Sequence, residues 1–139
     1  MKVISDHINL ETSGNTQVID ITDKINKLVK KSEIVQGIVL VSCIGSTGAI
    51  TTIEYEPALV KDLQSFLDEI ISANKKYLHN DTWSDANGHS HLRSSLIGPS
   101  LSLPVSENAL ELGTWQQVIF LDFDNRPRSR KIAFKIIGV

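Results

Sequence analysis

Short apolar runs and apolar–polar alternation along this chain predict β-strands. Val, Ile, Leu and Phe recur at every second position or in brief clusters, and turn-forming residues separate these runs. The apolar run over 35–43 also has the length of a buried strand. We expect strands over residues 2–10, 16–21, 35–43, 49–55, 100–105, 109–112, 115–123 and 129–137.

Two segments have the spacing of amphipathic helices. Thr22 is a suitable N-cap for a short helix with Asp23 in its first turn. The apolar residues at helical spacing around this segment are Ile21, Ile25, Leu28 and Val29. A longer helix is predicted over 57–71, with Pro57 at its first position.

A third helix is predicted over 88–97. Asn87 is a good N-cap for it, and Gly98-Pro99 is a typical helix stop. The alternative is a strand that runs through His89, His91 and Arg93.

The order of these elements predicts the fold class. Strands and helices do not alternate regularly, and the last third of the chain has the pattern of antiparallel strands. This order indicates an α+β fold with antiparallel sheet rather than a doubly wound parallel sheet. The chain has 139 residues, and no linker or internal repeat divides it. We therefore expect a single domain over residues 1–139.

Composition and charge mainly exclude classes of protein. Hydrophobic residues make up 41% and charged residues 22%, so disordered and disulfide-rich classes are disfavoured. The net charge of −2 disfavours a strongly basic nucleic-acid binder. The one cysteine, Cys43, cannot form an internal disulfide, and no apolar run has the length of a membrane span or signal peptide. We expect a cytoplasmic protein with neither a nucleic-acid nor a membrane partner.

A histidine-rich polar segment contains the first candidate site. His79, Asp85, His89 and His91 supply imidazole and carboxylate groups, which suit a divalent metal ion such as zinc. In a helix His89 and His91 would point apart, whereas in a strand they would point the same way. No simple zinc signature is matched. A polar loop whose histidines cap helices and bind buried carbonyls is an equal alternative.

Two further segments are candidates for binding an anion. Backbone N–H and hydroxyl groups of Gly45-Ser46-Thr47-Gly48 could cradle an anion, although a tight strand connection is the alternative. Arg128 and Arg130 share a face if their segment is a strand, and could clamp a phosphate or carboxylate. A charged, protected edge strand is the alternative there.

Three single residues are weaker candidates. Trp115 could stack on a heterocycle, or it could be a core residue at the start of a strand. Glu54 could act as a general base or a ligand, or be an ordinary surface carboxylate. Cys43 lies in an apolar run and has the setting of a small buried side chain rather than a nucleophile.

Several of these segments occur together in an order that resembles one known family. The segments are Asp85-Ala86-Asn87-Gly88-His89-Ser90-His91-Leu92, Leu96-Ile97-Gly98-Pro99-Ser100, Pro104-Val105, Leu112-Gly113-Thr114-Trp115-Gln116 and Pro127-Arg128-Ser129-Arg130. They resemble the YjbQ family, often described as secondary thiamine-phosphate synthases. The resemblance extends from the Gly45 loop to the C-terminus.

The resemblance implies an antiparallel β-sandwich with a few flanking helices, assembled as a homotrimer that binds metal. It also implies a weak thiamine-phosphate synthase activity, which joins a pyrimidine diphosphate to a thiazole phosphate. A small phosphorylated metabolite is then the expected ligand.

The resemblance also distributes roles among the candidate residues. It places Glu54, Asp85 and His91 in catalysis. It places the metal at His79, Asp85 and His91, and we add His89, which matches a more variable position of the family. It places phosphate and ring binding at Trp115, Arg128 and Arg130, and the chemistry of the loop adds Ser46 and Thr47. One departure concerns the loop: many relatives have His-Thr-Thr-Ala where this chain has Gly45-Ser46-Thr47-Gly48. The loop histidine of those relatives is therefore Gly45 here.

Three hypotheses follow. The first is a metal-assisted transferase or lyase that acts on a small phosphorylated heterocycle. The second is a non-catalytic protein that binds a metal or a phosphorylated metabolite, which the missing loop histidine favours. The third is a purely structural polar cluster that stabilises a trimer and has no ligand.

Overall fold

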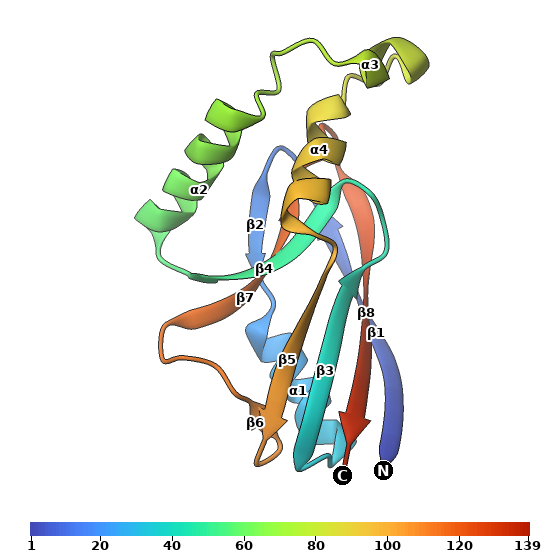
Figure 1. Ribbon diagram of the computed structural model, residues 1–139, viewed down its shortest axis with the longest axis vertical. Coiled ribbons are helices and arrows are strands. Elements are labelled where there is room, and N and C mark those ends of the chain that lie inside the picture. Colours follow the sequence, from blue (N-terminus) through green and yellow to red (C-terminus); the bar gives the residue numbers. More distant parts are fainter.

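The computed structural model describes residues 1–139 and contains eight strands and four helices (Figure 1). The strands are β1 (Lys2–Thr12), β2 (Gln17–Asp20), β3 (Gln36–Cys43), β4 (Gly48–Glu54), β5 (Ser100–Ser106), β6 (Ala109–Leu110), β7 (Gln116–Asp122) and β8 (Arg128–Gly138). The helices are α1 (Thr22–Ser32), α2 (Pro57–Ile70), α3 (Leu78–Trp83) and α4 (Gly88–Ile97).

The strands form two antiparallel sheets. One has the order β1-β8-β3-β5-β6 and the other β2-β7-β4, and every pairing is antiparallel. The predicted α+β class with antiparallel sheet is therefore confirmed. All eight predicted strands are present, and their ends differ from the predicted ones by at most two residues.

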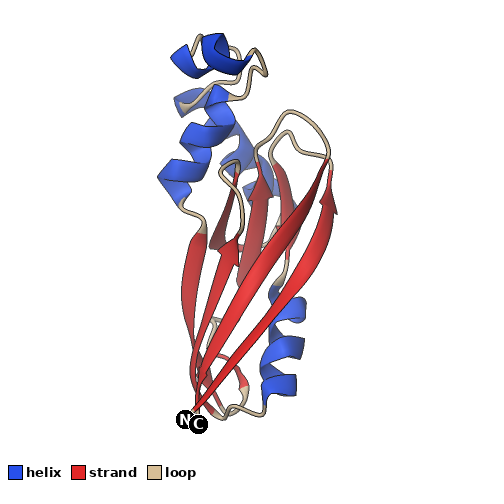
Figure 2. Ribbon diagram, turned by 90° about the vertical axis from the view of Figure 1, so that its right-hand side faces the viewer, coloured by secondary structure: helices blue, strands red, loops and turns tan.

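The main core lies between the two sheets. Val39 and Phe134 from the five-stranded sheet join Phe120 from the three-stranded sheet in one buried cluster. Ile25 of α1 belongs to the same cluster, which explains the apolar face of that helix. Figure 2 shows α1 beside the strands near the chain termini, with α3 at the opposite end.

A second, smaller core lies on the other face of the three-stranded sheet. Ile119 and Leu121 of β7 pack there with Leu67 of α2, and Ile97 of α4 covers the cluster. β7 is thus buried on both faces, which is why its sequence is an apolar run rather than an alternating one.

The capping of α1 differs from the prediction. Ile21, not Thr22, occupies the N-cap position, and its side chain offers no hydrogen bond. The side chain of Asp20 caps the helix instead. Its carboxylate accepts hydrogen bonds from the backbone N–H and the hydroxyl of Thr22 at 2.9 and 2.7 Å. Pro57 is at the start of α2 as predicted, and Glu56 caps that helix.

The predicted helix over 88–97 is present as α4, and the alternative strand is wrong. Asn87 holds the N-cap position, but its side chain makes no capping bond. Asn80 of the short helix α3, which was not predicted, accepts a 2.9 Å hydrogen bond from the Gly88 N–H instead. Because Asn80 accepts this hydrogen bond, the side-chain amide of Asn87 is free for other contacts.

Three segments meet at the end of the molecule opposite the two termini (Figure 1). They are the β3–β4 loop, the start of α4 and the β7–β8 loop. None of the four helices combines the length and apolar composition needed to cross a membrane.

Candidate functional site

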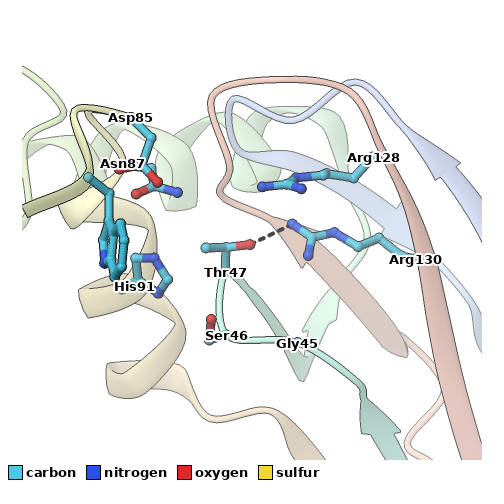
Figure 3. Close-up of a pocket in the computed structure, with 9 residues that line it drawn as sticks. Gly45, Ser46, Thr47, Asp85, Asn87, His91, Arg128 and Arg130 are labelled. Carbon is cyan, nitrogen blue, oxygen red and sulfur yellow. Dashed lines mark hydrogen bonds between the residues drawn. The ribbon is translucent and has the colours of Figure 1, made fainter. Parts of the chain in front are cut away.

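A polar pocket of about 470 Å³ opens where these three segments meet (Figure 3). Six of its lining residues were predicted from sequence, and the structure brings them together from three separate segments. The lining residues are Gly45, Ser46, Thr47, Trp83, Asp85, Asn87, His91, Arg128 and Arg130.

Arg130 forms the base of one wall of this pocket, and Asp122 fixes its position. Nε and Nη2 of Arg130 each donate a 2.7 Å hydrogen bond to the Asp122 carboxylate. Nη2 also donates to the Thr47 hydroxyl at 2.7 Å. The Asp122 side chain has no exposed surface, and that of Arg130 is 8% exposed. These hydrogen bonds outweigh burial and raise the pKa of Arg130 above its ordinary value.

Arg128 is fixed in the same way by Asp124. Nε and Nη2 of Arg128 lie 2.8 and 2.7 Å from Oδ2 of this fully buried carboxylate. Burial alone would raise the pKa of Asp124, but hydrogen bonds from Arg128, the Asn125 backbone and Asn87 outweigh it. The pKa of Asp124 is therefore below its ordinary value.

Each arginine keeps one nitrogen free of protein partners. Neither Nη1 of Arg128 nor Nη1 of Arg130 donates a hydrogen bond within the protein. Figure 3 shows both guanidinium groups directed toward the opposite wall. Gly45 keeps Nη1 of Arg130 open, because a Cβ at this position would lie only 3.3 Å from it. We call this side, formed by Arg128 and Arg130 with Asp122 and Asp124, the arginine wall.

Residues from α3, α4 and their connecting loop form the opposite side, which we call the helix wall. Nε2 of His79 lies 3.9 Å from Oδ1 of Asp85. The rings of His79 and His91 are 4.5 Å apart in an edge-to-face arrangement. Ser84 and Ala86 have positive φ angles of 57° and 53°, so the loop that presents Asp85 turns sharply.

Asn87 connects the two walls. Its Nδ2 donates a 3.4 Å hydrogen bond to Asp124, while its Oδ1 is buried and accepts no hydrogen bond. Nε2 of His79 is also buried without a partner. Buried polar atoms without partners are uncommon and unfavourable. The helix wall therefore contains buried polar atoms without partners, whereas both buried carboxylates of the arginine wall are paired.

The predicted metal ligands are only partly brought together. His79, Asp85 and His91 are neighbours, and their donor atoms are of the types that zinc prefers. No group of three His, Cys, Asp or Glu side chains converges on a point that could hold a metal ion. The residues of one chain, in this arrangement, do not fit a metal ion.

His89 lies on the other side of α4, as expected for a helix. It is 6% exposed and lines a separate pocket with Thr16 and Arg93. Burial first, and then the charge of Arg93, lower the pKa of His89 below its ordinary value. His89 therefore shares no site with His91.

Glu54 and Trp115 are also outside the pocket. Glu54 is exposed at the far end of β4 from the Gly45 loop, and Trp115 is 72% exposed just before β7. We assign neither a role in this pocket. Cys43 is the buried side chain that its setting predicted, and burial raises the pKa of its thiol.

Sequence reasoning missed Asp122 and Asp124, which hold the arginine wall in place. A signal was present, because Asp122 falls within the apolar run of β7. A carboxylate predicted to be buried needs a cationic partner. The alternating arginines at 128 and 130 are the obvious partners.

Comparisons with known proteins agree on one family. The sequence profile described as "UPF0047 protein YjbQ-like" matches residues 6–139. A UPF0047 protein of Archaeoglobus fulgidus is 35% identical over 130 residues, covering 94% of this chain and 98% of the relative. The UPF0047 protein YugU of Bacillus subtilis is 30% identical over 132 residues, covering 94% and 96%.

Solved structures show the same fold. A YbjQ-like protein of unknown function from Sulfolobus solfataricus superposes with a TM-score of 0.94 at 33% identity, covering 99% of both chains. A conserved protein of the yjbq/upf0047 family from Clostridium acetobutylicum has a TM-score of 0.87 at 35% identity, covering 95% of this chain and 99% of its own. The chain therefore belongs to the YjbQ (UPF0047) family.

Proposed function

We propose that the pocket binds a small phosphorylated metabolite. One observation carries this proposal: Arg128 and Arg130 each leave Nη1 unpaired beside the same pocket. Guanidinium N–H groups pair strongly with phosphate oxygens. Because Asp122 and Asp124 already fix both side chains, little freedom is lost when a phosphate binds.

The loop beside these nitrogens supports the same ligand. Ser46 and Thr47 line the pocket, and Thr47 is held by Arg130 and by a 3.3 Å hydrogen bond to Asp124. The Ser46 hydroxyl forms no hydrogen bond within the protein, so it is available to a phosphate oxygen.

Calorimetric titration with ethyl phosphate tests this binding. We expect saturable binding to the wild type and a loss of about 10-fold or more in R128Q, since a hydrogen bond to a charged group contributes about 1.5–3 kcal/mol. R126Q is the matched control, because Arg126 is exposed and lies outside the pocket. Failure of the wild type to bind, or equal losses in the two variants, would contradict the proposal.

We further propose that the bound metabolite reacts by displacement of diphosphate, the reaction that the family resemblance implies. In thiamine-phosphate synthesis, the thiazole nitrogen forms a C–N bond with the pyrimidine methylene carbon. The C–O bond to diphosphate breaks, and its electron pair leaves with the diphosphate. Arg128 and Arg130 would stabilise the charge on this leaving group, and His91, across the pocket, would donate a proton to it.

The transfer is tested by incubating purified protein with the pyrimidine diphosphate and the thiazole phosphate. Thiamine phosphate should form faster with the wild type than with H91A, and each should be assayed with and without a chelator. Product no greater than that of H91A would exclude the transfer, while the binding proposal would still stand on the titration.

Metal binding is a second candidate, which the unpartnered Nε2 of His79 beside Asp85 and His91 favours. The side chains would have to move to converge on an ion, so we assign no step to a metal. Elemental analysis of protein purified without added metal is the test. A stoichiometric content of zinc or a similar ion that falls in H79A would support this role, and metal-free protein would exclude it.

We also propose that the working unit is a homotrimer. Leu78 is 89% exposed and Trp83 is 72% exposed on α3, next to the pocket. Burial of such exposed apolar side chains against a neighbouring chain is favourable. Light scattering coupled to gel filtration should give three times the chain mass of 15.4 kDa, and a monomer mass would contradict the proposal.

A further inference from the structure

We infer that the ligand of the pocket is a phosphate ester that carries its own positively charged nitrogen. This inference rests on the proposed phosphate-binding function and names the class of phosphate ester. It follows from the way charge is divided between the two walls of the pocket.

The arginine wall supplies hydrogen-bond donors without excess positive charge. Asp122 and Asp124 are each fully buried, and each pairs with one arginine at 2.7 Å. Two buried carboxylates therefore balance the two guanidinium groups. What remains for a ligand is a set of directed N–H groups rather than a strong positive field.

The helix wall has the opposite character. The Asp85 carboxylate is 43% exposed, accepts no hydrogen bond and has only the His79 ring nearby, at 3.9 Å. Beside it in the lining, Asn87 is 4% exposed and its Oδ1 has no donor. Figure 3 shows Asp85 and Asn87 together, across the pocket from Arg128 and Arg130. This wall thus presents one exposed carboxylate, that of Asp85, beside a buried amide oxygen that has no donor.

When His79 and His91 are neutral, a phosphate dianion without a cationic group would bind to a pocket with one surplus negative charge, that of Asp85. An ammonium group on the same molecule removes this repulsion and pairs with the carboxylate. The pocket volume of about 470 Å³ accommodates a phosphate with a short aminoalkyl chain. Phosphate toward the arginine wall and ammonium toward Asp85 satisfies both sides at once.

The test compares O-phosphoethanolamine with ethyl phosphate, which have the same phosphate group and differ in the ammonium. Titrations at about pH 8 keep the phosphate doubly charged, and EDTA throughout keeps any divalent cation from occupying the helix wall. We expect phosphoethanolamine to bind the wild type about 10-fold more tightly. In D85N the two affinities should agree within about twofold, with ethyl phosphate bound at least as well as by the wild type.

D81N is the matched control, because Asp81 is an exposed carboxylate on α3 outside this pocket. It should keep the wild-type preference. Equal binding of the two esters by the wild type, or a preference that persists in D85N, would overturn the inference and leave the phosphate-binding proposal intact. Binding of neither ester would overturn both.

Discussion

The two walls of the pocket hold their polar groups in opposite ways. The arginine wall rests on β7, β8 and their connection, and its carboxylates are buried and fully paired. The helix wall rests on α3, α4 and a tightly turned loop. Its polar atoms are partly exposed or lack partners.

The two walls differ in how many of their buried polar groups find a partner when the chain folds. Folding alone pairs the buried carboxylates of the arginine wall, so this wall contributes both to stability and to a fixed set of donors. On the helix wall, Asp85 and the buried oxygen of Asn87 have no donor in the single chain. Mutations on the two sides should therefore separate effects on stability from effects on binding.

The largest expected effect is on the arginine wall. D122A leaves Arg130 buried beside no carboxylate, and we expect it to lower the free energy of unfolding by about 3–5 kcal/mol. D85A on the helix wall removes a half-exposed carboxylate and should cost less than about 1 kcal/mol. Urea denaturation of both variants and the wild type measures this. Similar losses in D122A and D85A would refute the distinction between the walls.

Acid should weaken the arginine wall next. Because the pKa of Asp124 is lowered in the folded protein, its contribution to stability is complete above about pH 4, the ordinary pKa of aspartate. That contribution is lost as the pH falls through the lower, folded-state pKa, by at most about 1.4 kcal/mol per pH unit.

The charged groups beside Asp124 are Arg128, which pairs with it, and Arg130, whose Nη2 is 4.0 Å away. Urea denaturation of the wild type and D124N between about pH 6 and about pH 3 tests the prediction. The stability advantage of the wild type should shrink toward low pH. An advantage that stays constant or grows on acidification would show that Asp124 does not titrate in this way.

A smaller effect is expected where the loop meets the arginine wall. In G45A the new Cβ would lie 3.3 Å from Nη1 of Arg130 and would shield the nitrogen from a ligand. We expect ethyl phosphate to bind about 3- to 10-fold more weakly, with little change in thermal stability. In G113A, the matched control, the nearest atoms are 3.7 Å away and affinity should not change. Unchanged affinity in G45A would mean that Arg130 does not contact the phosphate.

Much of the fold could be predicted because it depends on local pattern. Alternation and apolar runs identified every strand, and the helical spacing over 57–71 identified α2. The short helix α3 was missed because its six residues are mostly polar and show no helical period. The capping role of Asn80 toward α4 is a contact between two helices, so no local signal indicates it.

The candidate site was predictable as residue types but not as an arrangement. Ser46, Asp85 and Arg128 stood out by chemistry, yet only the packing of two sheets against α4 brings them together. Glu54 and Trp115 also stood out, but β4 and the loop before β7 carry them to the other end of the small sheet. Asp122 and Asp124 were overlooked, although the place of Asp122 in an apolar run and the arginines at 128 and 130 are a signal for buried ion pairs.

The most direct test of the phosphate site is an NMR titration of the ¹⁵N-labelled wild type with inorganic phosphate. Phosphate bound in this pocket should cause saturable shifts of the backbone amides of Gly45, Ser46 and Thr47 and of the side-chain N–H groups of Arg128 and Arg130. R128Q should lose these shifts. Shifts confined to Lys131 and Lys135, exposed residues of β8 outside the pocket, or no saturable shifts at all, would contradict the proposal that this pocket binds phosphate.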